Sequence, residues 1–178
     1  VVILCLGEHY LQTGEATSRT ELSLPENQME LFCAVKTVNP NVAVVLFNGH
    51  PLLLDKLSRN AAAILQAWLP GTEGGHAILD LLTGTKNPSG KLPMTFPRNM
   101  GQIPIYYNHF STGRPLTGTD PQRFVSKYTD TPNTPLFPFG YGLSYAEFSY
   151  SDVSLSSDSL TSEDSITASV QLKNTGAC

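Results

Sequence analysis

Apolar positions in the first half of the chain follow strand and helix periodicities in turn. Short aliphatic runs bounded by turn residues predict strands buried on both faces. Apolar stripes spaced by three and four residues predict helices between them. The predicted elements are strands at 1–6, 42–47 and 62–68 and helices at 25–38, 52–57 and 73–82. This order is typical of βαβ units and predicts an α/β fold, a parallel-type sheet with helices on both faces.

The second half of the chain has a different pattern. Prolines and aromatic residues recur through 87–142, which excludes long helices and predicts an extended but ordered segment. Apolar and polar residues then alternate in 148–151 and in 166–172, with a Ser-rich turn at 154–165 between them. This alternation predicts the first strands of a β-sandwich.

These patterns give an expected domain organisation. We expect an α/β sandwich domain over residues 1–144, which includes the proline-rich segment, and the start of a β-sandwich over residues 145–178. A sandwich of this kind needs about seven strands, so only its beginning fits. Residue 1 stands inside an apolar run without an initiator Met. We therefore expect the chain to continue upstream, and its compartment stays unknown.

Charge and composition restrict the partners. The net charge is −4 with 11 Lys and Arg residues, which gives no support for nucleic acid or an anionic membrane surface as a partner. No apolar run approaches the roughly 20 residues of a membrane span. Cys5, Cys33 and Cys178 have no metal-binding spacing and are interpreted as buried free thiols. The histidines also lack metal-ligand spacing, so we expect neither a metal nor a cofactor.

Short motifs follow one another along nearly the whole chain. They are GE at 7–8, GEATSR at 14–19, LP at 24–25, NGHP at 48–51, WLPGTEGG at 68–75, NPSGKLP at 87–93 and PFGYGLSY at 138–145. Together they resemble glycoside hydrolase family 3, in its bacterial β-glucosidase branch. The resemblance implies an enzyme with a (β/α)₈-type barrel, an α/β sandwich and a fibronectin type III-like domain, of which this chain holds most of the second and the start of the third.

The same resemblance implies a reaction. It is hydrolysis of terminal non-reducing β-D-glucosyl residues in β-glucosides or oligosaccharides, by a retaining mechanism that uses two carboxyl groups. The nucleophilic Asp belongs to the barrel, which is the expected partner of this chain, so the isolated fragment is expected to be inactive. A non-catalytic carbohydrate-binding or scaffold fragment of the same fold is the alternative.

Two carboxylates compete for the role of general acid/base. Both lie in the polar stretch 8–23, which leaves the first predicted strand at its carboxyl end, where ligand loops lie in such sheets. The motif match places the acid/base at Glu15. Glu8 is the alternative, and its structural role would be to bond loop N–H groups or Arg19. Arg19 could pair with either carboxylate.

Three further residues are candidates for contact with substrate. Tyr107, Asn108 and His109 combine aromatic rings with an amide, which is common sugar-contacting chemistry, while a structural role stays open for them. His50 departs from the resembled family, which usually has Arg in this turn. That departure puts a structural ion pair at this position in doubt.

Overall fold

The computed structural model describes residues 1–118 and 123–176, apart from the side chain of Glu26. The chain divides into two units, Val1–Ile78 with Lys91–Tyr141 and Leu79–Gly90 with Gly142–Cys178. None of the helices in the described residues has the length and apolar character needed to cross a membrane.

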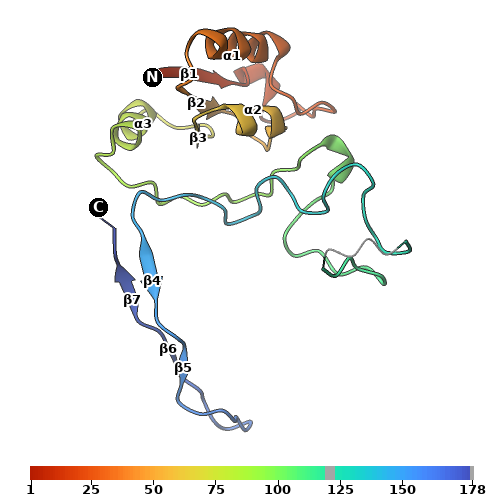
Figure 1. Ribbon diagram of the computed structural model, residues 1–178, viewed down its shortest axis with the longest axis vertical. Helices are drawn as coiled ribbons and strands as arrows, with labels where there is room; N and C mark the ends of the chain where they lie inside the picture. The colour runs from red at the N-terminus through yellow and green to blue at the C-terminus, as the bar shows by residue number, and fades with distance from the viewer. Residues whose placement is uncertain (119–122, 177–178) are drawn as a thin grey trace. The chain divides into compact units, whose positions relative to one another are not determined.

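The first unit is built on a three-stranded parallel sheet (Figure 1). Its strands are β1 (Val2–Gly7), β2 (Val42–Phe47) and β3 (Ala63–Gln66), in the order β1-β2-β3. The register pairs Gly7 with Phe47 and Leu46 with Gln66, so the carboxyl ends of all three strands meet at one edge. Loops that leave this edge are therefore neighbours.

One face of the sheet carries two helices, α1 (Glu26–Val38) and α2 (Asp55–Asn60). Phe32 of α1 and Leu57 of α2 are each 1% exposed and join one apolar cluster with alternate residues of β2. The buried members of this cluster are Leu6, Leu24, Phe32, Val42, Val44, Leu46, Leu52, Leu54, Leu57 and Phe96. The predicted α/β fold with a parallel sheet is confirmed.

The expectation that the first strand is buried on both faces is wrong. Ile3 is 49% exposed and Cys5 is exposed, and β1 is one of the two edge strands of the sheet. Burial on both faces holds for β2, the central strand, where Val44 and Val45 are both buried. The prediction of buried thiols also fails at Cys5, while Cys33 is partly buried and Cys178 lies outside the described residues.

The second predicted helix begins later than its sequence pattern suggests. Residues 52–54 precede the helix, and Leu53 N donates to Leu22 O at 2.9 Å beside a short parallel bridge between Ser23 and Leu53. Leu52 and Leu54 fill the core from this non-helical segment, so α2 starts only at Asp55. The third helix, α3 (Gly74–Thr83), lies within one residue of its predicted bounds.

In its described residues, the proline-rich segment is extended and contains no long helix, as predicted. The beginning and the end of this segment pair with each other. Leu92 N donates to Tyr141 O and Phe96 N donates to Phe137 O, each at 2.8 Å. Phe96 is 1% exposed and belongs to the core of the first unit. The only helical turn found in the described part of this segment is η2, a 3-10 helix at Met100–Gln102.

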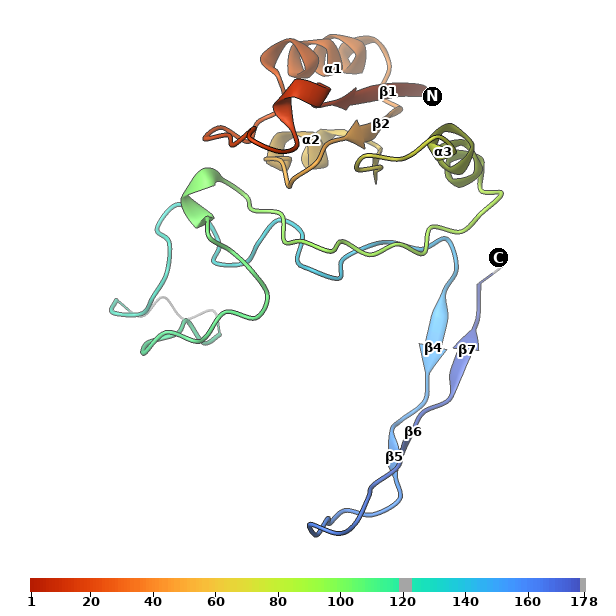
Figure 2. The ribbon, with the colours of Figure 1, turned by 180° about the vertical axis from the view of Figure 1, so that it is seen from behind.

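The second unit contains an antiparallel hairpin, whose two arms lie side by side in both views (Figures 1 and 2). Strand β4 (Phe148–Tyr150) pairs with β7 (Leu172–Asn174), and β5 (Ser154–Leu155) pairs with β6 (Ala168–Ser169). The single strand predicted over 166–172 is thus two short strands, and β5 falls inside the predicted Ser-rich turn. All four strands are exposed, so the apolar alternation here meets no packing partner among the described residues.

Candidate functional site

The candidate site lies at the carboxyl edge of the parallel sheet. Glu8 follows β1 directly, Asn48 follows β2, and Gln66 is the last residue of β3. Ligands of open α/β sheets bind outside this edge. The stretch from Glu8 to Ser23, called the acidic loop below, leaves β1 here and carries both candidate carboxylates.

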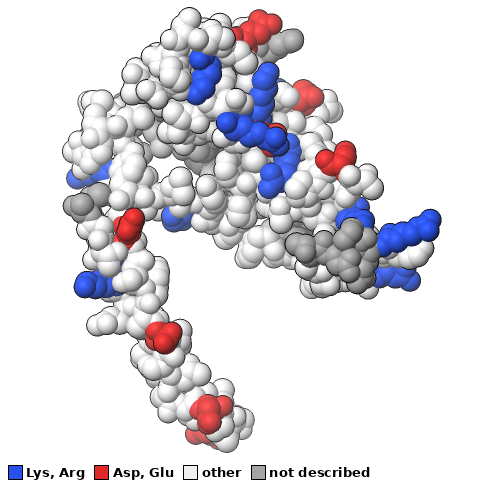
Figure 3. Space-filling view, viewed as in Figure 1, with Lys and Arg blue, Asp and Glu red and all other residues white. Residues whose placement is uncertain are grey.

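Glu8 is fixed in place by its surroundings. Its side chain has no exposed area, and its carboxylate accepts a hydrogen bond from Arg19 and a 3.3 Å bond from Gly49 N. Its own N–H donates to Phe47 O at 2.8 Å. A buried carboxylate needs such partners to offset its lost hydration. On the face shown in Figure 3, Lys and Arg side chains lie beside Asp and Glu side chains among a majority of other residues.

Arg19 therefore pairs with Glu8 and not with Glu15. Its Nη2 also lies 3.4 Å from Ser23 O, so the guanidinium joins the two ends of the acidic loop. His50 approaches the same carboxylate from the turn after β2, with Nε2 3.1 Å from Glu8 Oε1. Nε2 is buried and forms no hydrogen bond with a described group. A histidine thus occupies the position at which the resembled family usually has Arg.

Gly7 and Gln28 brace the start of the acidic loop. Gln28 of α1 bonds both the N–H and the C=O of Gly7, each at 2.8 Å. Gly7 has φ +149°, and a Cβ there would lie 1.9 Å from Phe47 O, so only glycine fits. His9 then caps the 3-10 helix η1 (Tyr10–Gln12) by accepting from Leu11 N at 3.3 Å.

Glu15 is in the opposite situation, at the exposed tip of the acidic loop. Gly14 has φ +115° and Ala16 has φ +59°, so the chain reverses sharply around Glu15. Thr17 Oγ1 donates to Gly14 O at 2.5 Å and closes this turn. Glu15 is exposed, and no described group forms a hydrogen bond or ion pair with its carboxylate. Its position is defined by the backbone and its carboxylate is available to a ligand.

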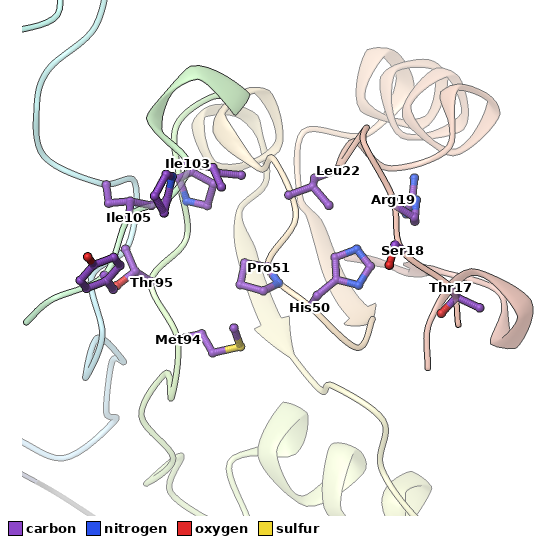
Figure 4. A pocket seen from close by; sticks show the side chains of 13 residues that line it. Thr17, Ser18, Arg19, Leu22, His50, Pro51, Met94, Thr95, Ile103 and Ile105 are labelled. Atoms are coloured by element: carbon purple, nitrogen blue, oxygen red, sulfur yellow. The ribbon is translucent and has the colours of Figure 1, made fainter. Parts of the chain in front are cut away.

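A hollow of about 510 Å³ lies beside the acidic loop (Figure 4). Thr17, Arg19 and His50 form its polar side, and Met94 and Ile105 lie on the opposite, mainly apolar side. Its volume is in the range of small-molecule sites, which are typically apolar with a few polar groups. Glu15 is not among the residues that line it.

The three predicted substrate-proximal residues lie on a separate, exposed segment. Tyr107 stacks on Phe139 with ring centroids 4.5 Å apart, and His109 Nδ1 lies 3.1 Å from Phe110 O. Asn108 is exposed. The preceding residue, Tyr106, lines the hollow. The structure brings none of the three into bonded contact with Glu15 or Glu8 within the described residues.

A buried amide pair at the sheet edge escaped the sequence analysis. Asn48 is fully buried, its Oδ1 accepts from Gln66 Nε2 at 2.9 Å, and its Nδ2 donates to His50 O at 2.7 Å. This network fixes the turn that carries His50. The available signal was a polar residue directly after the second apolar strand and another polar residue inside the third, near the edge where loops carry function.

Comparison with known proteins identifies the family. Residues 1–145 match the glycosyl hydrolase family 3 C-terminal domain. The chain belongs to glycoside hydrolase family 3. It is 49% identical over 176 residues to a periplasmic β-glucosidase of Salmonella typhimurium, covering 99% of this chain and 23% of that protein.

Other family 3 proteins are similar over the same extent. A β-xylosidase of Formosa agariphila is 38% identical over 178 residues, with 98% of this chain and 23% of that protein covered. The crystal structure of a β-glucosidase from Listeria innocua in complex with isofagomine superposes with a TM-score of 0.91 at 47% identity, covering 97% of this chain and 24% of that one. The chain thus spans about a quarter of the length of these relatives, and the predicted resemblance to the bacterial β-glucosidase branch is confirmed.

Proposed function

We propose that the enzyme containing this chain hydrolyses terminal non-reducing β-D-glucosyl residues by a retaining mechanism, with Glu15 as general acid/base. In the first step Glu15 would protonate the glycosidic oxygen while a nucleophilic Asp, outside this chain, attacks the anomeric carbon. In the second step Glu15 would take a proton from the water that attacks the glycosyl-enzyme and releases the sugar.

The contrast between the two carboxylates of the acidic loop supports this assignment. The Glu8 side chain has no exposed area and is engaged by Arg19, whereas Glu15 stands unbonded at a sharp turn within the described structure. A proton donor must reach a leaving-group oxygen within hydrogen-bond distance, which the Glu8 carboxylate could do only by leaving its partners. An acid of this kind is kept protonated by burial and by a nearby ionised nucleophile, and an opposing barrel domain would supply both.

The proposal assigns a different role to each domain. Residues 1–144 would form the α/β sandwich domain that contributes Glu15, and residues 145–178 would begin a fibronectin type III-like sandwich. The barrel would be the partner that supplies the nucleophile and most contacts to the sugar. Tyr107, Asn108 and His109 would lie near the bound substrate. The names of the relatives support β-glucoside hydrolysis.

Leaving-group dependence tests the role of Glu15 in the full-length enzyme. Glu15→Ala should lower kcat/KM about 10²- to 10⁴-fold on a disaccharide or alkyl glucoside, the range of general acid–base catalysis. The first step on a nitrophenyl glucoside should suffer much less, because nitrophenolate departs with little protonic help. The glycosyl-enzyme should then accumulate, and azide should restore turnover as a glycosyl azide of retained configuration.

Glu8→Ala is the comparison variant. It should lower activity evenly across leaving groups and show no rescue by azide. If leaving-group dependence and rescue appear in the Glu8 variant and not in the Glu15 variant, the two residues exchange roles. Since one relative is named a β-xylosidase, nitrophenyl β-xyloside should be assayed beside the glucoside, and a preference for xyloside would overturn the sugar assignment.

A further inference from the structure

His50 places a titratable ring against the buried side chain of Glu8, the first residue of the acidic loop. Glu8 and Arg19 are called the base of this loop below. The side chain is 26% exposed, and its Nε2 is buried 3.1 Å from Glu8 Oε1. The same oxygen accepts from Arg19. The backbone of His50 is held by Asn48, whose Nδ2 donates to His50 O at 2.7 Å. The backbone of the turn is therefore fixed, and it holds the ring next to Glu8.

The charge of this ring decides how strongly it holds Glu8. A neutral ring that forms no hydrogen bond here contributes only a weak dipolar contact. A protonated ring adds a full positive charge 3.1 Å from a carboxylate that water does not reach, and such charge-assisted contacts are stronger than neutral ones. Histidine is the side chain whose charge ordinarily changes between about pH 5 and 8.

We propose that His50 is a positioning residue for Glu15, and that protonation of its ring tightens the base of the acidic loop. This inference rests on the proposed role of Glu15. The loop tip is built on the segment between Glu8 and Arg19, so a firmer hold on Glu8 restricts the movement of Glu15. The loop is thus more ordered at mildly acidic pH and looser above it.

Other ionisable groups near His50 bear on the sign of this effect. Arg19 contacts the same Glu8 oxygen and repels a protonated ring, but it is 20% exposed and shares its charge with Ser23 O. Tyr106 lines the adjoining hollow, whose described lining contains no Asp, Glu or Lys. The charge that a protonated His50 would contact is therefore Glu8, with Nε2 3.1 Å from Oε1, and this contact is attractive.

Protonation of His9 would have the opposite effect on the order of the loop, so the test uses a variant that lacks this histidine. Its Nδ1 accepts from Leu11 N, and a protonated Nδ1 has no lone pair left to accept. Low pH would therefore loosen η1 through His9 while it tightens the loop base through His50. His9→Asn retains an acceptor at the helix cap and removes the titration.

Hydrogen exchange in the full-length enzyme tests the proposal. In the His9→Asn background, amides of residues 10–22 are compared at about pH 5.5 and pH 8 after correction for intrinsic exchange rates. Protection should fall about 3- to 10-fold as the pH rises, between the effects of an exposed ion pair and of a hydrogen bond to a charged group. His50→Arg should keep high protection at both pH values, and His50→Gln low protection at both.

His76→Gln is the matched control. His76 is an exposed histidine 3.0 Å from Glu73 on α3, and its loss should leave the pH dependence of the acidic loop intact. The proposal stands if both His50 replacements abolish the pH dependence, and its persistence in either one overturns it. Exchange is measured without turnover, so a failure of Glu15 as the acid/base would appear in the leaving-group assay alone.

Discussion

The base and the tip of the acidic loop belong to one segment yet have opposite surroundings. At the base, Gly7, Glu8 and Arg19 are held by bonds from α1, from the turn after β2 and from each other. At the tip, Glu15 is exposed between two residues with positive φ. The polar groups at the base form hydrogen bonds and ion pairs within the protein, whereas the Glu15 carboxylate at the tip has no such partner among the described residues. Such a loop can fix the backbone that carries a reactive carboxylate while it leaves the carboxylate itself unbonded.

Removing the buried charge gives the largest expected stability difference between base and tip. Glu8→Gln should destabilise the sheet by about 3 kcal/mol, at the lower end of the range for breaking a buried ion pair, because Arg19 retains some exposure. Glu15→Gln should change stability by less than about 0.5 kcal/mol, as exposed substitutions do. Pulsed hydrogen exchange of β1 and β2 peptides across a urea series measures both. Equal effects from the two variants would contradict the division of the loop.

Two glycines extend the comparison of the loop base with the loop tip to the backbone. Gly7→Ala should cost about 1–3 kcal/mol, the range for overpacking, because its Cβ would meet Phe47 O at 1.9 Å. Gly14→Ala meets no atom within 4 Å and carries only the strain of its positive φ, so it should cost less. Both are measured by the same urea series. A Gly14 variant less stable than the Gly7 variant would show that the tip is the more tightly packed part.

A smaller effect is expected at the brace from α1. Gln28→Ala removes both bonds to Gly7 and should cost about 1–2 kcal/mol, which is one to two ordinary hydrogen bonds. Faster amide exchange should be confined to Gly7 and the residues that follow it. Asn27→Ala, at the exposed neighbouring position of α1, is the control and should leave these amides unchanged. A uniform rise in exchange over the whole sheet would mean that Gln28 supports the core instead.

Local sequence patterns predicted the elements of the sheet better than their exposure. The run 42–47 and the stripe of α1 carried enough periodicity to give β2 and α1 nearly residue by residue. The run 1–6 looks the same, but its burial depends on what lies beside β1, which no local pattern encodes. The late start of α2 has a similar cause, since Leu52 is buried in the core from the non-helical segment before the helix.

Polar contacts in the site were likewise not predictable from local sequence patterns. The motif containing Glu15 and the loop that carries it were readable from sequence, but the choice of partner for Arg19 was not. Glu8 and Glu15 both precede Arg19 in the sequence, so spacing alone does not choose between them, and the fold decides by placing Gly49 and His50 beside Glu8. The Asn48 and Gln66 pair joins two strands and depends on register. Contacts between distant segments thus required the structure.

The smallest effect expected concerns Glu21, at the end of the loop base. The Ser23 hydroxyl and backbone N–H donate to its carboxylate at 2.5 and 3.0 Å, and these bonds hold the pKa of Glu21 below its usual value of 4.5. Because the pKa is lowered on folding, the contact contributes above pH 4.5 and is lost as the pH falls through the folded value. Ser23→Ala removes the larger of the two causes and should move the pKa of Glu21 back up toward its ordinary value. Carboxyl titration of the ¹³C-glutamate-labelled chain measures the shift, with Ser18→Ala, exposed on the same loop, as the control. An unchanged Glu21 titration in the Ser23 variant would show that the hydroxyl does not hold this end of the loop, and the base would then end at Arg19.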